Sequence, residues 1–176
     1  MLKLKEFNLE DIKQEYELLQ KIPPENGFEN EYYNCTIEDF YQIHAPKILN
    51  NSKGIDLKPG YVPGSYYFLW DDNKIVGLVK IRYYLNDHLR KGAGHIGYAV
   101  PKEYQGKGYA SKGLALAIKL CKYLIKEDEI YFSVHKDNKA SLKVQLKNGA
   151  YITGENKEEY FTRIKLNKWF QLTKIL

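Results

Sequence analysis

The sequence is poor in cysteine and contains no long apolar run. Its two cysteines, Cys35 and Cys121, lie far apart among 176 residues. This spacing predicts neither a disulfide framework nor a cysteine metal site. No segment approaches the roughly 18 apolar residues of a membrane span, and the charged residues 1–6 lack the apolar core of a signal peptide. We therefore expect a cytoplasmic protein with no metal and no membrane partner.

Composition indicates one folded domain spanning residues 1–176. The chain is 44% hydrophobic and 28% charged, which is ordinary for a globular protein. Its net charge of +5 is compatible with an anionic partner such as a nucleotide cofactor. The lysines are spread along the chain without a basic block interleaved with aromatic residues, so we do not expect nucleic-acid binding.

Apolar periodicity and turn residues predict an α/β protein. Strands are expected at residues 2–7, 66–70, 74–85, 95–100, 129–134, 149–154 and 159–166. Helices are expected at 9–21, 37–49, 106–126 and 138–148, with Asn8 and Thr36 as caps of the first two. No repeat or linker separates these elements, so we predict a single domain built on a mixed sheet.

The strongest helix signal covers residues 106–126. One apolar stripe runs along it, formed by Leu114, Ala117, Ile118, Cys121, Leu124 and Ile125. Because Cys121 falls within this stripe, we interpret it as a core residue and not as a nucleophile.

A strand, a glycine-containing turn and this helix follow one another at residues 98–110. The first turn of a helix leaves backbone N–H groups unpaired, and the helix dipole attracts anions to that end. Gly106 and Gly108 allow a phosphate to approach the backbone without a Cβ in the way. The segment therefore predicts a pyrophosphate site, to which Lys107 could add a charge. The plainer alternative is a tight strand-to-helix turn.

A GxGxxG pattern at residues 92–97 offers a second candidate for a phosphate-binding turn. A dinucleotide fingerprint needs a strand before it and a helix after it. Here a turn precedes the glycines and a strand follows them, so we interpret the match as coincidental.

Gln105-x-x-Gly108-x-Ala110 resembles the pyrophosphate signature of the GNAT N-acetyltransferase superfamily. Asn138-x-x-Ser141 and Lys147-Asn148-Gly149 resemble its second motif, at the usual order and separation. Residues 62–65, 81–86 and 94–98 are similar to a bacterial branch of predicted acetyltransferases. The resemblance covers about residues 65–166. It implies the GNAT fold, a mixed twisted sheet with helices on both faces, and acetyl-CoA as the acyl donor.

By this resemblance, residues 65–166 form the CoA-binding core and the helices within about 8–50 lie on the acceptor side. The cofactor-binding residues that it implies are Tyr98, Ala99, Val100, Gln105, Gly106, Lys107, Gly108, Tyr109, Ala110, Asn138 and Ser141. A cap of the following helix is the plainer role for Asn138. Dimers are common in the superfamily, so a homodimer is compatible with it.

The resemblance also implies direct attack of a primary amine on the thioester. A backbone N–H near Tyr98 would stabilise the oxyanion. His95 is the first candidate base, with His88, Asp87 and His135 as alternatives and a packed sheet residue as its plainer role. Many relatives carry an acidic tyrosine where this chain has Gln145. Ser141, another tyrosine or water would then have to assist the leaving thiolate.

The acceptor is expected between the N-terminal helices and the sheet. The candidate residues are Glu25, Asn26, Phe28, Glu29, Glu31, Tyr32, Tyr33, Tyr83 and Tyr84, whose carboxylates and rings would suit a cationic amine. An ordinary polar loop is the plainer reading. A non-catalytic acyl-CoA-binding or regulatory module is the main functional alternative, and a phosphate- or nucleic-acid-binding domain is the second.

Overall fold

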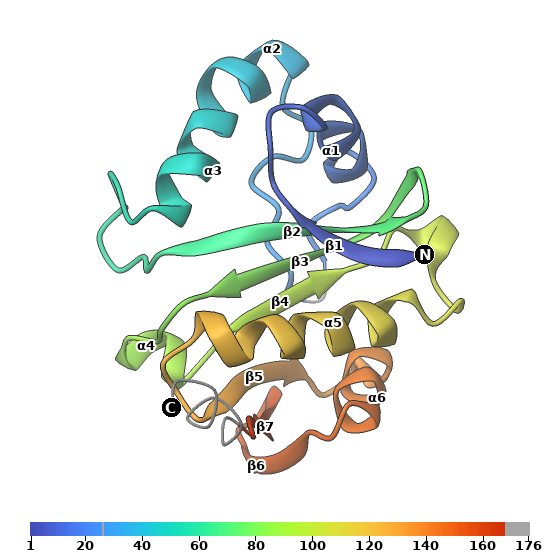
Figure 1. Ribbon diagram of the computed structural model, residues 1–176. Coiled ribbons are helices and arrows are strands. Elements are labelled where there is room, and N and C mark those ends of the chain that lie inside the picture. Colours follow the sequence, from blue (N-terminus) through green and yellow to red (C-terminus); the bar gives the residue numbers. More distant parts are fainter. Residues whose placement is uncertain (26, 168–176) are drawn as a thin grey trace, which may run out of the picture.

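The computed structural model describes residues 1–25 and 27–167. Its strands are β1 (Leu2–Glu6), β2 (Gly64–Asp71), β3 (Lys74–Arg82), β4 (Ile96–Ala99), β5 (Glu129–His135), β6 (Tyr151–Glu155) and β7 (Glu159–Lys165). Its helices are α1 (Ile12–Leu19), α2 (Ile37–Asp39), the π-helical η1 (Phe40–His44), α3 (Ala45–Ser52), α4 (Asp87–Arg90), the 3-10 helix η2 (Lys102–Tyr104), α5 (Tyr109–Leu124) and α6 (Lys139–Lys147). Figure 1 shows α1 to α3 on one side of the first sheet and α5 on the other.

The predicted sheet is divided into two antiparallel sheets. The first has the order β1-β2-β3-β4, and the second has the order β5-β7-β6. In the first sheet Tyr66 lies opposite Lys80, and Lys80 lies opposite Gly97. This row places three successive strands in register on one face, because directly opposite residues share a face.

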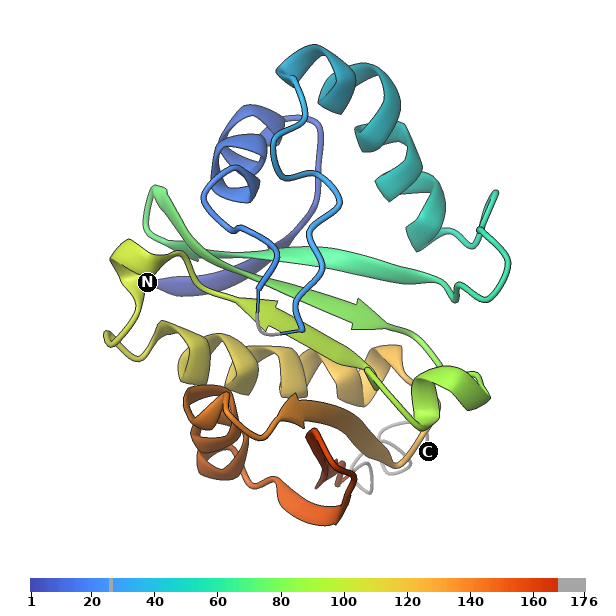
Figure 2. The same ribbon diagram turned by 180° about the vertical axis from the view of Figure 1, so that it is seen from behind.

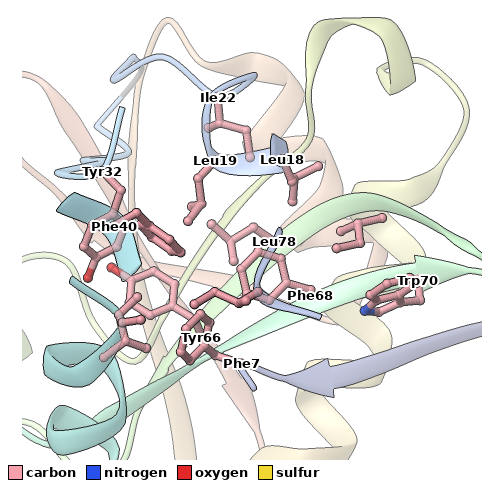
Figure 3. Packing of buried hydrophobic residues seen from close by; sticks show 14 residues of the cluster. Phe7, Leu18, Leu19, Ile22, Tyr32, Phe40, Tyr66, Phe68, Trp70 and Leu78 are labelled. Carbon is pink, nitrogen blue, oxygen red and sulfur yellow. The ribbon is translucent and has the colours of Figure 1, made fainter. Parts of the chain in front are cut away.

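Strand alternation gives the first sheet one hydrophobic core on each face. Phe68 and Leu78 lie in the core beneath α1 and η1, together with Phe40. Figure 3 shows these side chains converging with Tyr32 and Tyr66. Val79 lies in the opposite core, which α5 completes with Leu114, Ala117 and Cys121. Cys121 is fully buried, as predicted for a core residue.

Several helix boundaries differ from the sequence prediction. The first helix begins at Ile12 and not at residue 9, because the Asn8 side chain accepts hydrogen bonds from the amides of Glu10 and Asp11 in a turn that precedes the helix. Thr36 does cap its helix, accepting from the Asp39 amide at 3.1 Å. The short helix α4, capped by Asn86, was not predicted, since four residues carry too little periodicity.

Candidate active site

Strands β4 and β5 meet at one end and are otherwise paired with different partners. The His95 amide donates to the Tyr131 carbonyl at 2.8 Å, and the Tyr131 amide donates to His95 Nδ1 at 3.0 Å. Gly94 is required at this junction: its φ is +65°, and a Cβ there would lie 2.0 Å from the Tyr131 oxygen. Beyond it, β4 pairs with β3 and β5 pairs with β7. The two facing edges therefore open from this point (Figure 2).

The open edge of β4 offers a backbone donor at Tyr98. The Arg82 amide donates to the His95 carbonyl, and Lys80 and Gly97 are register partners. Amides alternate in direction along a strand, so the Gly97 N–H faces β3 and the Tyr98 N–H faces the gap toward β5. A thioester carbonyl placed in this gap would meet that N–H.

The N-terminus of α5 lies just beyond β4 and has the properties of an anion site. No side chain caps it, and Gly108 at the cap position has a φ of +80°. A Cβ on Gly106 or Gly108 would find no atom within 4 Å. The backbone of this turn is thus open to an approaching group, and the first-turn amides and helix dipole favour a phosphate there. These residues fit the pyrophosphate of CoA.

The polar side chains of this segment are engaged with the protein itself. Gln105 Nε2 donates to the Val100 carbonyl at 3.1 Å, and Lys107 Nζ donates to the Glu103 carbonyl at 2.9 Å. The Tyr109 hydroxyl donates to Asp71 at 2.7 Å. What the segment presents outward is therefore mainly its backbone.

Tyr98 reaches from β4 to α6 on the α5 face. Its Oη lies 2.7 Å from Ser141 Oγ and 3.0 Å from the Ser141 carbonyl. Burial raises the pKa of Tyr98, while hydrogen bonds from Ser141 and Gln145 oppose that rise. Asn138 caps α6 by accepting from the Ser141 amide at 3.0 Å, so the plainer role predicted for Asn138 is present.

Gln145 lies one helical turn after Ser141 and is 2% exposed. Its Oε1 accepts a hydrogen bond from Thr162 Oγ1 at 2.6 Å. The glutamine therefore links α6 to β7, and the phenol of Tyr98 on β4 lies within hydrogen-bonding reach of it.

The structure gives His95 the surroundings of a packed sheet residue. It is fully buried, its Nδ1 accepts from Tyr131, and its Nε2 lies 3.1 Å from Glu127 Oε2. Burial lowers the pKa of His95, although Glu127 opposes this shift. Since Nδ1 accepts an N–H, the neutral ring carries its proton on Nε2. An acceptor amine has no access to either nitrogen, so this geometry does not favour His95 as the base.

A turn at the tip of the segment between α1 and α2 crosses the opening between the strands. The Phe28 amide donates to the Glu25 carbonyl at 2.9 Å. The Phe28 ring covers Gly97 on β4, where a Cβ would lie 3.5 Å from it, and a Cβ on Gly27 would lie 2.9 Å from His135 Cδ2 at the end of β5. Asn26 lies outside the described residues. His135, which the sequence offered only as an alternative base, therefore borders the opening. Strand alternation places it on the outward face of β5, and this signal could have identified it.

The other predicted acceptor residues are not all brought together. Glu29 acts electrostatically on the Arg82 guanidinium, so its charge is partly offset. Tyr33 is half-buried in the same loop. Tyr83 bonds to Ser65 Oγ at 2.6 Å on the face that carries Ile81, the register partner of Ser65. This is the α5 face, opposite to the face that Phe28 covers at Gly97.

The fold and site define an α/β protein with an uncapped, glycine-opened helix N-terminus beside an open strand edge. The family model for the acetyltransferase (GNAT) domain matches residues 8–151. The chain therefore belongs to the GNAT acetyltransferase family, and the fold class and enzyme class predicted from the sequence are confirmed. No curated protein gave a significant match.

Solved structures of acetyltransferases share this fold at low identity. A ribosomal-protein-S5-alanine acetyltransferase from Vibrio fischeri has a TM-score of 0.69 and 20% identity, covering 96% of this chain and 94% of its own. A spermidine N-acetyltransferase from Vibrio cholerae, in complex with CoA and spermine, has a TM-score of 0.63 and 17% identity, covering 95% and 96%. A ribosomal L7/L12 alpha-N-protein acetyltransferase in complex with coenzyme A has a TM-score of 0.69 and 16% identity, covering 95% of each chain.

Two features are absent from the part of the chain that the structure describes. No helix there is long and apolar enough to cross a membrane. Residues 1–25 and 27–167 also contain no group of three or more side chains suited to hold a metal ion.

Proposed function

We propose that this protein transfers an acetyl group from acetyl-CoA to a primary amine by direct attack. The observation that carries the proposal is the unpaired edge of β4, which is followed after η2 and a short turn by the uncapped, glycine-opened N-terminus of α5. An extended amide-containing chain that ends in a pyrophosphate matches both features. Acetyl-CoA has this shape and acts here as the acyl-donor substrate.

The proposed donor site has two parts. Backbone groups of Tyr98, Ala99 and Val100 would bind the pantetheine arm, and the amides of residues 105–110 would bind the pyrophosphate. Asn138 and Ser141, at the start of α6, would border the arm from the β5 side. The side chains of Lys107 and Tyr109 contribute to holding the turn in its open shape.

Tyr98 has two proposed roles in the chemistry. Its N–H would stabilise the oxyanion that forms when the amine attacks the thioester carbonyl. Its hydroxyl, bonded to Ser141, would protonate the departing thiolate. The raised pKa of Tyr98 keeps the phenol protonated at neutral pH, as an acid requires. A phenol from β4 would thus replace the tyrosine that many relatives carry at the position of Gln145.

The attacking amine must lose a proton, and His135 is the proposed acceptor of that proton. The half-buried ring lies beside Gly27 at the open end of β5. An imidazole within reach of the amine, directly or through one water, can act as a general base. His95 has a structural role in this proposal and holds the β4–β5 junction together.

The test is an acetylation assay with Tyr98→Phe, following thiol release from acetyl-CoA over a panel of amines. We expect the wild type to turn over at least one amine, and the variant to lose roughly 10²-fold or more in kcat while still binding acetyl-CoA. Equal kcat in both proteins would exclude Tyr98 as the acid.

The alternative is a non-catalytic acyl-CoA-binding module of the same fold. The observation that favours it is Gln145, which is locked to Thr162 and cannot donate an acidic proton. Acetyl-CoA binding without turnover of any amine in a broad panel would establish this alternative.

A further inference from the structure

Two basic side chains lie on the face of β3 that is turned toward the loop carrying Phe28. Lys80 shares its row with Tyr66 on β2 and Gly97 on β4. Arg82, two residues further, points to the same face. Both side chains are half-buried, so water screens their charge less than it would at an open surface.

Other groups of the protein largely compensate the positive charge of Arg82. Its Nη1 donates to the Gly94 carbonyl at 3.1 Å. Burial lowers the pKa of Arg82, and Tyr66, Glu29 and Tyr61 oppose that shift. Arg82 is therefore part of the folded framework around the β4–β5 junction.

The positive charge of Lys80 is not compensated in this way. It lies 5.0 Å from the centroid of the Tyr66 ring. Among the ion pairs of residues 1–25 and 27–167, none involves Lys80, whereas Glu31 on the nearby loop pairs with Lys58 at 3.5 Å. A half-buried cation without a carboxylate partner favours the approach of an anion.

Lys80 lies on β3, directly opposite the β4 residue that precedes Tyr98. Gly97, its direct register partner, precedes Tyr98, whose N–H faces the gap between β4 and β5. Gly97 carries no side chain, so nothing from β4 stands between the Lys80 side chain and the Phe28 ring that covers this glycine. An acceptor entering under the loop would pass close to the ammonium.

We propose that the acceptor carries a carboxylate close to its reactive amine, and that Lys80 binds this carboxylate. This inference rests on the proposed function. The same cation favours the neutral form of the acceptor amine, because a nearby positive charge disfavours a second one. A polyamine, which brings several positive charges, meets repulsion at the same place. The protein thus differs in substrate charge from the spermidine acetyltransferase whose fold it shares.

The test compares kcat/KM for the peptides Ala-Asp-Ala-amide and Ala-Arg-Ala-amide, with L-aspartate and spermidine as further acceptors. We expect the wild type to prefer the acidic peptide, and Lys80→Met to lower kcat/KM for that peptide about twofold to fivefold, the size of one modest ion pair. Lys80→Arg should retain the preference. Lys74→Met, at the exposed start of the same strand, should change nothing. Turnover of the acidic peptide but not of L-aspartate would identify a chain terminus as the acceptor. Turnover of L-aspartate but not of the peptide would identify a free amino acid. Both outcomes support a carboxylated acceptor.

A loss of similar size for both peptides in Lys80→Met would overturn the inference, as would a wild-type preference for spermidine or the basic peptide. Melting of each variant controls for folding. If the protein acetylates amines without regard to their charge, the inference fails and the proposed function stands. If acetyl-CoA neither binds nor reacts, both fail.

Discussion

Replacing Gly108 by alanine tests the acetyl-CoA site with little disturbance of the folded protein. Gly108 has a φ of +80°, and a Cβ at this position would find no atom within 4 Å. The new methyl group therefore clashes with nothing in the free protein. It would, however, occupy the space through which a phosphate must approach the amides of the α5 N-terminus.

The expected magnitudes separate these two effects. An L-residue in the left-handed region costs about 1–2 kcal/mol, which for a chain of this size lowers Tm by about 2–8 °C. Acetyl-CoA at a hundredfold excess over Kd stabilises the wild type by about 2.7 kcal/mol. If the methyl group weakens binding tenfold to hundredfold, that stabilisation falls to about 1.4–0.4 kcal/mol at the same concentration.

The assay is thermal melting with and without acetyl-CoA, with ATP and NADH as ligand controls. Gly60→Ala is the matched variant, since Gly60 has a φ of +81° and equally open surroundings in the loop before β2. Both variants should melt earlier than the wild type, and only Gly108→Ala should lose most of the shift caused by acetyl-CoA. A full shift in Gly108→Ala would refute the placement of the pyrophosphate at this turn.

Three further predictions address Tyr98, Glu15 and His135. Removing the hydroxyl bonded to Ser141 in Tyr98→Phe should cost about 0.5–1.5 kcal/mol of unfolding free energy, measured by urea titration, in addition to the loss of kcat. Glu15 is fully buried, and burial raises its pKa to about 8, so the folded state binds a proton that the unfolded state releases and stability falls as pH rises from about 4.5 to 8. Glu15→Gln should therefore stabilise the protein by on the order of 4 kcal/mol at pH 8 and by little at pH 4.5. His135→Asn should lower kcat/KM roughly 10²-fold at neutral pH.

Each of these three predictions has a control variant or a result that would contradict it. Tyr16→Phe removes a hydroxyl that donates to the Cys35 carbonyl at 2.9 Å, and it should lose stability without losing kcat. The exposed Glu10 provides the control Glu10→Gln, which should retain the pH dependence of the wild type; a Glu15→Gln variant that also retained it would contradict a buried, protonated carboxyl. An unchanged kcat/KM in His135→Asn would exclude this histidine as the base.

The order of elements and the open glycine turn before α5 could be predicted from local sequence. The stripe through Leu114 and Cys121 fixes which face of α5 is buried, because a helix repeats every 3.6 residues. Gly106 and Gly108 signal an open helix start, because the backbone conformation and the absent Cβ are properties of single residues. The caps at Thr36 and Asn138 are equally local.

The sequence by itself therefore determined the family, the α/β class and the glycine-containing turn before α5. Only the tertiary structure decided which histidine lies at the opening: His95 is sealed by its contacts with Tyr131 and Glu127, whereas His135 faces the loop. It likewise placed Tyr83 on the α5 face. The physical reason is that the contacts that place Tyr83 and His95 join residues 18 to 36 positions apart, and local periodicity does not encode which strand edge is left unpaired.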